Sequence, residues 1–200
     1  MLIGGIQKLS LIDYPGKISA VIFTQGCNFL CPYCHNPQLV HSDRFEKPME
    51  TRKVLEFLST RVGRLDGVVL SGGEPTLQSD LADFIGQIKP FGFAVKLDTN
   101  GSRPRVLEQL LLEQCLDYVA MDLKAPPDKY KQVSGGFAGS AAIAESVRLL
   151  AESGVAHEFR TTFDPDLLDP KDLERIKAWA GASPWRVQER LTQRHEVTKV

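Results

Sequence analysis

The sequence lacks an excess of either charge, because 24 Lys and Arg residues balance 25 Asp and Glu residues to a net charge of −1. A basic excess lets a protein bind phosphate backbones by charge alone, so nucleic acid is not favoured as a partner. No run approaches the ~18 apolar residues of a membrane-spanning helix. Residues 1–8 lack the order of basic, apolar and small residues that a signal peptide shows. These absences predict a cytoplasmic protein with no membrane partner.

Cysteine is scarce, with four residues in 200, and their placement argues against disulfides. Cys27, Cys31 and Cys34 lie within eight residues, whereas Cys115 is far away in the sequence. Small disulfide-linked domains instead spread their cysteines along the chain. The clustering therefore predicts a metal centre, and Cys115 is expected to be a core cysteine.

Length and composition predict one globular domain over residues 1–200. The chain has 42% hydrophobic and 24% charged residues, which is ordinary for a folded protein. It shows no internal repeat, no low-complexity tract and no linker rich in Pro, Gly or Ser. A domain is typically ~100–200 residues long, so one fold with one core is expected.

Short apolar runs alternate with segments of helical periodicity. The expected strands are residues 18–24, 67–71, 93–98, 118–123, 158–162 and 185–188, and the expected helices are residues 51–64, 78–89, 104–114, 140–153 and 170–180. Nearly continuous apolar strands that alternate with helices predict parallel pairing and right-handed crossovers. Six strands are too few for a closed eight-stranded barrel. The expected fold class is α/β, a partial (β/α)6 barrel with its helices outside.

Polar residues follow five of the expected strands at their carboxyl ends. In parallel α/β sheets these ends lie along one edge, and ligands bind there. The residues concerned are 24–27, 71–75, 98–101, 122–124 and 160–162. We therefore expect one site built from several strand ends.

The loop at residues 24–37 places three thiols directly after the first expected strand. A structural zinc site takes four ligands, and His35 or Cys115 would have to complete it. Three thiolates without a natural fourth partner suit an iron–sulfur cube whose fourth iron is open to a substrate. The spacing alone leaves zinc and the iron–sulfur cluster as open alternatives.

Residues 27–37, CNFLCPYCHNP, resemble the cluster loop of the radical S-adenosylmethionine (SAM) enzymes. Four more segments resemble those of the small activating enzymes of glycyl radical proteins: LIDYPGK at 11–17, GGEP at 72–75, DTNG at 98–101 and MDLK at 121–124. The resemblance covers residues 9–190, nearly the whole chain. Five motifs in order make it far more specific than three cysteines alone.

The resemblance implies a 4Fe-4S cluster held by Cys27, Cys31 and Cys34, with SAM bound at the open iron. It implies reductive cleavage of SAM to a 5'-deoxyadenosyl radical, which takes a hydrogen atom from a glycine of a partner enzyme. The implied SAM contacts are Tyr33 at the adenine, Gly72, Gly73 and Glu74 near the methionine amine, and Asp98, Asp122 and Lys124 at its polar groups. Arg160 is added because a guanidinium can bind a carboxylate through two parallel hydrogen bonds.

The motif at residues 11–17 and the short chain look most like the activating proteins of anaerobic ribonucleoside-triphosphate reductases. The runner-up is a pyruvate formate-lyase activating enzyme. Electrons are expected from a flavodoxin or ferredoxin. Two further alternatives are a small radical SAM enzyme acting on a free metabolite and a non-catalytic zinc-binding module, which would have no use for Glu74, Asp98, Asp122 and Lys124 together.

Two local patterns have plain structural interpretations. Asp122 and Lys124 are two residues apart on a strand, so they face the same side and would, in isolation, be read as a surface ion pair. Residues 189–200 form a short, charged tail with no convincing final helix, whereas the related proteins continue further. We therefore expect a carboxyl end that is truncated or altered.

Overall fold

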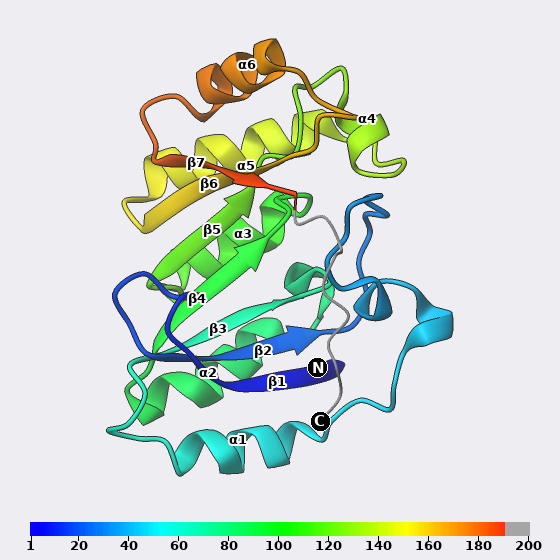
Figure 1. Ribbon diagram of the computed structural model, residues 1–200. Helices are drawn as coiled ribbons and strands as arrows, with labels where there is room; N and C mark the ends of the chain where they lie inside the picture. Colours follow the sequence, from blue (N-terminus) through cyan, green and yellow to red (C-terminus); the bar gives the residue numbers. More distant parts are fainter. Residues whose placement is uncertain (191–200) are drawn as a thin grey trace.

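The computed structural model describes residues 1–190 and shows a curved seven-stranded sheet backed by helices (Figure 1). The strands are β1 (Ile3–Ser10), β2 (Ser19–Thr24), β3 (Gly67–Gly72), β4 (Ala94–Thr99), β5 (Tyr118–Asp122), β6 (Ala156–Phe163) and β7 (Trp185–Glu189). They follow one another across the sheet in sequence order, and β2 to β7 are parallel. The expected partial (β/α)6 barrel is confirmed. The tail at 191–200 lies outside the described residues.

The crossover segments between the parallel strands contain the helices. These are α1 (Thr51–Ser59), α2 (Leu81–Ile88), α3 (Pro104–Leu112), α4 (Tyr130–Val133), α5 (Ser140–Ser153) and α6 (Pro170–Ala180), with 3-10 turns at Pro37–Leu39, Ser42–Arg44, Pro75–Leu77 and Lys89–Phe91. No helix among residues 1–190 is long and apolar enough to cross a membrane. The expected helices of residues 140–153 and 170–180 agree with α5 and α6.

Three helix predictions were too long, and one of them, residues 104–114, ends at Leu112 in α3. The first expected helix ends at Ser59 rather than residue 64, because Gly63 has a φ of +74° in a run of turns. The second begins at Leu81 rather than residue 78, after the turn of Pro75–Leu77. The start of α6 agrees with its signals: Asp169 and Asp172 form a reciprocal capping box.

β1 was missed by the sequence analysis. It is an edge strand antiparallel to β2, and its register shifts between Ile3 and Gly5. Gly4 and Gly5 explain the omission, because glycine has low strand propensity and weakens the alternation that marks a strand. The sheet is consequently mixed rather than wholly parallel.

The helices cover the outer face of the sheet, where the main hydrophobic core lies. Ile22, Leu70, Leu97 and Val119, one from each of four neighbouring strands, are fully buried in that core. The inner face has a separate, smaller apolar group, made by Val21 and Val69 with Tyr14. The inner face is therefore free to carry polar residues toward the carboxyl ends of the strands.

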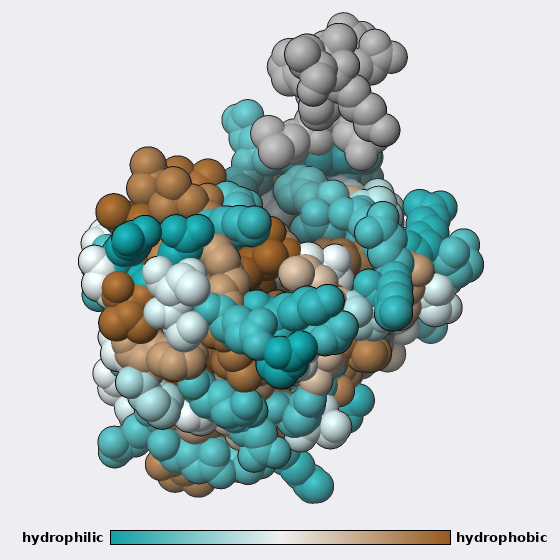
Figure 2. Space-filling view, turned by 90° about the horizontal axis from the view of Figure 1, so that it is seen from below, coloured by the Kyte–Doolittle hydropathy of each residue, from teal (hydrophilic) through white to brown (hydrophobic). Residues whose placement is uncertain are grey.

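The segment at 11–17 closes the floor of the barrel, at the end opposite those polar residues. The Tyr14 side chain is 3% exposed, and its ring centroid lies 5.9 Å from that of Tyr118. A Cβ atom at Gly67 would lie 2.9 Å from the Tyr14 ring, so β3 can pass this close to the ring only because residue 67 is glycine. Leu11 and Ile12 on the same loop are exposed. Figure 2, seen from below, shows hydrophobic patches among hydrophilic side chains on the molecular surface.

Candidate active site

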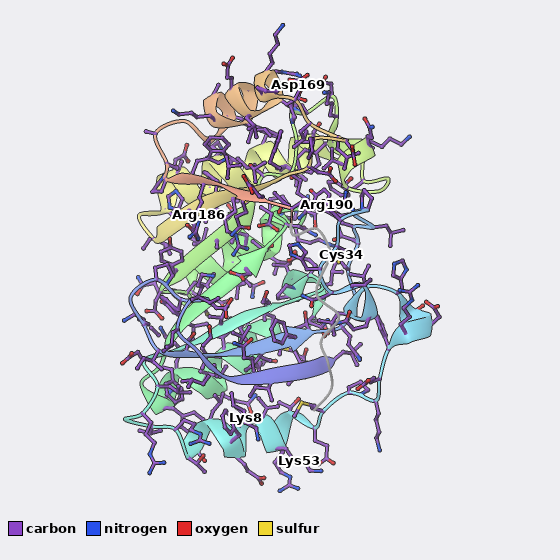
Figure 3. All side chains as sticks on the ribbon, viewed as in Figure 1. Lys8, Cys34, Lys53, Asp169, Arg186 and Arg190 are labelled. Atoms are coloured by element: carbon purple, nitrogen blue, oxygen red, sulfur yellow. The ribbon has the colours of Figure 1, made fainter. Side chains whose placement is uncertain are left out.

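The carboxyl ends of the strands surround a cavity of about 230 Å³. Every site residue expected from the sequence lines this cavity except Gly72, which directly precedes the lining residue Gly73. The parallel register explains the convergence: Thr24 pairs with Gly72, and Asp122 pairs with Arg160, so the strand ends lie level. Figure 3 shows Cys34 and Arg190 at this same end of the molecule. The cavity is the candidate active site.

The cluster loop, residues 24–37, is tied to its surroundings by backbone hydrogen bonds. The Gly26 amide donates to the Leu39 carbonyl at 2.8 Å, and the Leu30 amide donates to the Ser134 carbonyl at 2.9 Å. The Phe29 ring packs 4.7 Å from the ring of Phe137, centroid to centroid. These contacts fix the loop that carries the three cysteines.

Cys27, Cys31 and Cys34 are unbridged thiols that line the cavity together. Burial raises the pKa of the Cys27 thiol to about 11, although the Phe29 amide donates a hydrogen bond to its Sγ at 3.4 Å. Burial also raises the pKa of Cys31, against the opposing effect of Lys124. Both thiols therefore have to release a proton when a metal cation binds.

The three thiols do not converge as ligands of one ion. Among residues 1–190, no group of three or more His, Cys, Asp or Glu side chains is placed to hold a single metal ion. A cube cluster takes each thiolate on a different iron atom, so thiols that line one cavity without meeting at a point fit it. The assignment of these three cysteines as its ligands stays a prediction.

Gly72 and Gly73 allow the end of β3 to approach the start of the cluster loop. A Cβ at Gly72 would lie 2.3 Å from the Thr24 nitrogen, and a Cβ at Gly73 would lie 2.0 Å from the Gly26 oxygen. The Gly73 amide donates to the Thr24 carbonyl at 2.8 Å, and the next amide donates to Gly26 at 2.8 Å. The glycine pair is therefore needed for close backbone contact.

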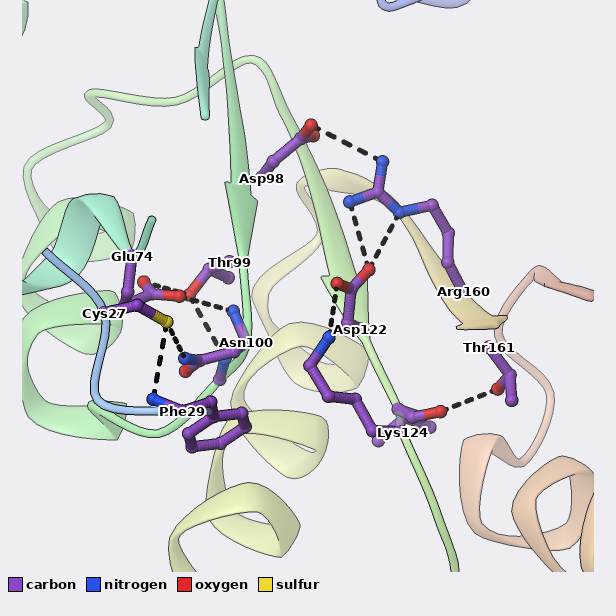
Figure 4. A network of polar contacts seen from close by, with 12 residues as sticks. Cys27, Phe29, Glu74, Asp98, Thr99, Asn100, Asp122, Lys124, Arg160 and Thr161 are labelled. Carbon is purple, nitrogen blue, oxygen red and sulfur yellow. Dashed lines mark hydrogen bonds and ion pairs between the residues drawn. The ribbon is translucent and has the colours of Figure 1, made fainter. Parts of the chain in front are cut away.

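Glu74 joins the loop after β3 to the loop after β4 (Figure 4). Its fully buried carboxylate accepts hydrogen bonds from the Asn100 amide at 2.6 Å, the Thr99 hydroxyl at 2.7 Å and the Thr76 amide at 3.1 Å. Burial raises the pKa of Glu74, and these donors act in the opposite direction. The carboxylate therefore lines the cavity in a fixed position, and its Oε2, which accepts from the Asn100 amide alone, keeps capacity for a further donor.

Asn100 was not singled out individually by the sequence analysis, which treated residues 98–101 as one motif. Its Nδ2 donates to Asn28 Oδ1 at 3.0 Å and lies 3.9 Å from Cys27 Sγ. Asn28 in turn donates to the Ser102 hydroxyl at 2.8 Å. The two asparagines therefore connect the cluster loop to the end of β4, a link that depends on tertiary contact.

Alternating charges line the inner face next to the cavity (Figure 4). Lys124 Nζ lies 3.0 Å from Asp122 Oδ2, and Arg160 Nη2 lies 3.1 Å from Asp122 Oδ1. Arg160 Nη1 also lies 3.5 Å from Asp98 Oδ2. Burial opposes ionisation of Asp122, but Lys124 and Arg160 outweigh it and lower the pKa of Asp122 to about 2. Asp122 and Lys124 are thus part of the cavity wall rather than an isolated surface pair.

Lys96 is a member of this charged group that sequence reasoning missed. It lies on β4, is 1% exposed and forms an ion pair with Asp98, two residues along the same strand. Arg160, in turn, contacts two protein carboxylates, so its guanidinium is already partnered. The spacing of Lys96 and Asp98 could have revealed the pair, since residues two apart share a strand face.

The remaining predicted residues differ in burial. Tyr33 is 7% exposed, its ring centroid lies 5.9 Å from Lys124 Nζ, and its hydroxyl has no hydrogen-bond partner within residues 1–190.

Cys115 is only partly buried at the edge of the core, with its Sγ 3.6 Å from a Glu113 carboxylate oxygen, so the expectation of a core cysteine was wrong. It follows α3, away from the cavity.

The model of the radical SAM superfamily matches residues 21–179. This chain belongs to the radical SAM superfamily. A Methanocaldococcus jannaschii protein assigned as a glycyl-radical enzyme activating enzyme is 42% identical over 181 residues, 88% of this chain and 73% of the relative. The pyruvate formate-lyase-activating enzyme of Clostridium pasteurianum is 31% identical over 175 residues, 85% of this chain and 71% of the relative.

Solved structures support the same fold. SuiB of Streptococcus suis, bound to S-adenosylmethionine, matches with a TM-score of 0.64 at 11% identity, covering 89% of this radical SAM chain and 39% of SuiB. Family membership makes the protein an enzyme that uses a 4Fe-4S cluster and SAM, as expected from the sequence. The same family membership argues against the alternative of a non-catalytic zinc-binding module.

Proposed function

We propose that this radical SAM enzyme generates a glycyl radical on an anaerobic ribonucleoside-triphosphate reductase. The observation that carries the proposal is the single cavity in which three thiols lie together with Asp98, Asp122 and Lys124. The relative assigned as a glycyl-radical enzyme activating enzyme, at 42% identity, supports the reaction class. The resemblance of residues 11–17 supports the choice of partner.

The residues of the cavity suit both cofactors. Cys27, Cys31 and Cys34 would hold the cluster. When bound, the cluster would supply the one electron needed to cleave SAM to methionine and a 5'-deoxyadenosyl radical, and that radical would take a hydrogen atom from the glycine to give 5'-deoxyadenosine. The structure's part is to hold the reactants in place and exclude water, because such a radical must meet its target first.

Lys124 and Tyr33 are the residues best placed to bind SAM. An ammonium group has three N–H donors, and Asp122 takes one from Lys124, which leaves two for the methionine carboxylate. Tyr33 lines the cavity and would lie against the adenine, largely through its backbone. Arg160 holds Asp98 and Asp122 in place, and we assign it that positioning role together with any contact to the SAM carboxylate.

Backbone and carboxylate groups at the end of β3 would receive the methionine amine. Gly73 lines the cavity without a side chain, so its carbonyl can be approached closely. Glu74 presents a buried carboxylate beside it, held in place by three neighbouring residues. This arrangement supports the predicted roles of Gly72, Gly73 and Glu74.

Pyruvate formate-lyase is the second candidate partner, supported by the activating enzyme of Clostridium pasteurianum at 31% identity. Both partners are glycyl radical enzymes, so the cavity chemistry is common to the two proposals. The electron donor is proposed to be a flavodoxin or ferredoxin.

The test is anaerobic reconstitution with iron and sulfide, followed by reduction with dithionite and electron paramagnetic resonance. A reduced cluster signal that shifts when SAM is added supports SAM binding at an open iron. Incubation with each purified partner should then give a glycyl radical signal and 5'-deoxyadenosine in proportion. A glycyl radical on pyruvate formate-lyase but not on the reductase overturns the choice of partner. SAM cleavage with no protein radical on either overturns the activase.

A further inference from the structure

A second cavity, of about 290 Å³, adjoins the candidate active site and shares Asn36 with it. It is formed by the start of β1, the end of β2 and the segment after the cluster loop. Figure 1 shows this segment passing beside the start of β1, and the Met49 amide fixes it by donating to the Ile3 carbonyl at 2.8 Å. The two cavities therefore form adjacent parts of one surface.

Gln25 gives this cavity a fixed acceptor. Its side chain is 1% exposed, and its Nε2 donates to the Glu46 carbonyl at 2.8 Å. Its Oε1 is buried and has no hydrogen-bond partner among residues 1–190. An unpartnered buried acceptor is costly, so one retained beside a cavity points to a ligand that brings an N–H or O–H donor.

Gly4 and Gly5 leave the backbone of β1 bare beside that acceptor. A Cβ at Gly4 would lie 2.8 Å from Gln25 Cγ, so the glycine is required for the glutamine to lie over the strand. A Cβ at Gly5 would meet nothing within 4 Å, so the space above this residue is open. Gly5 pairs with Phe23, which also lines the cavity and offers one apolar contact.

The other lining groups match the chemistry of a polypeptide backbone. Asn36 and Gln38 carry amides, which both donate and accept hydrogen bonds as peptide groups do. Arg44 and Glu46 add one charge of each sign, which suits a polar chain better than an anion or a cation. We propose that this second cavity binds the polypeptide segment beside the glycine of the partner enzyme, with Gln25 Oε1 accepting a backbone N–H.

This proposal rests on the proposed function and adds to it the place where the substrate polypeptide docks. The segment would enter over Gly5 and Gln25 and reach the active-site cavity past Asn36, the residue that lines both. Binding outside the SAM cavity is useful because remote contacts can hold a reacting atom in position. The second cavity should therefore affect the partner's KM and leave SAM cleavage alone.

The test is the Gly5→Val variant, which places a branched side chain in the open space, and its Cβ meets no protein atom within 4 Å. Its matched control is Gln7→Val, on the same strand and same face but outside the cavity. Reconstituted enzymes are reduced with dithionite, and two rates are measured: 5'-deoxyadenosine release without partner, and glycyl radical formation against partner concentration.

We expect Gly5→Val to raise the KM for the partner about tenfold or more, with kcat and partner-free SAM cleavage unchanged. Gln7→Val should match the wild type in both assays. A KM for Gly5→Val equal to that of wild type overturns the docking proposal, and so does an equal loss of partner-free SAM cleavage. If wild type forms no glycyl radical on any partner, the proposed function itself has failed, and that result is separate from the behaviour of the variants.

Discussion

The close approach of Gly73 to Gly26 makes Gly73→Ala the sharpest test of how the site is built. The added Cβ would lie 2.0 Å from the Gly26 oxygen and 2.6 Å from its carbonyl carbon, and both atoms are backbone. The two segments must separate by at least about 1 Å before the first contact reaches 3.0 Å. That shift breaks the two backbone hydrogen bonds, both of 2.8 Å, that join Gly73 and Glu74 to the loop.

The energetic cost follows from these contacts. Two hydrogen bonds contribute ~1 kcal/mol each, and overpacking costs ~1–3 kcal/mol. Because the terms overlap, we expect Gly73→Ala to lose ~2–4 kcal/mol of unfolding free energy. In a chain of this length that is a fall of about 5–15 °C in Tm. Gly26 directly precedes Cys27, so the iron and sulfide bound per chain should fall as well.

The control is Gly86→Ala, on α2, where an added Cβ meets nothing within 4 Å. Removing a glycine from a helix interior should stabilise the protein by ~0.5–1 kcal/mol and leave cluster content unchanged. Thermal unfolding of the metal-free protein and iron and sulfide analysis after anaerobic reconstitution give the two readouts. A Gly73→Ala protein with the Tm and cluster content of wild type would refute the reasoning.

Three further outcomes are expected for ionic and capping contacts. Lys96→Met removes one of the two cations beside the Asp98 carboxylate, which keeps Arg160, and should cost ~1.5–3 kcal/mol in urea unfolding, partly recovered in the double variant with Asp98→Asn. Burial opposes ionisation of Asp172, but the hydrogen bond from Lys129 outweighs it and lowers the pKa of Asp172 below the ordinary 3.8. This stabilisation is present above pH 3.8 and is lost as the pH falls through the lowered pKa, so Asp172→Asn should flatten the loss of Tm on acidification below pH 3.8. Asp169→Ala removes the side-chain cap of α6 and should cost ~1 kcal/mol in the same urea assay.

The parallel strands and the position of the site could be predicted from the sequence because their signals are local. Each parallel strand is an apolar run followed by polar residues, and the right-handed crossover rule places those residues at one edge. The pairing of Asp122 with Arg160 on neighbouring strands shows the result, since it brings together residues 38 positions apart. The identity of the cofactors came instead from the resemblance, since cysteine spacing alone left zinc open.

The features that sequence reasoning missed depend on contacts between distant segments. β1 has Gly4 and Gly5 where a strand pattern needs β-branched or aromatic residues. It is therefore recognised as a strand only from its pairing with β2. Two of the residues that donate to Glu74, Thr99 and Asn100, are near it only because β3 and β4 end side by side. A carboxylate with donors already in place cannot be distinguished in the sequence from one that is free for a ligand.

Buried polar side chains that already have protein partners hold the walls of the two cavities in place, whereas buried polar atoms without partners are candidate contacts for a ligand. Glu74 and Arg160 are held by protein partners, so their positions are set before any ligand binds, as preorganised electrostatic sites require. Within residues 1–190, Tyr33 Oη and Gln25 Oε1 are buried without partners, and they lie in different cavities. These are two of the four buried side-chain atoms without partners in this range, and their places in adjoining cavities agree with the proposal that a cofactor and its polypeptide substrate meet there.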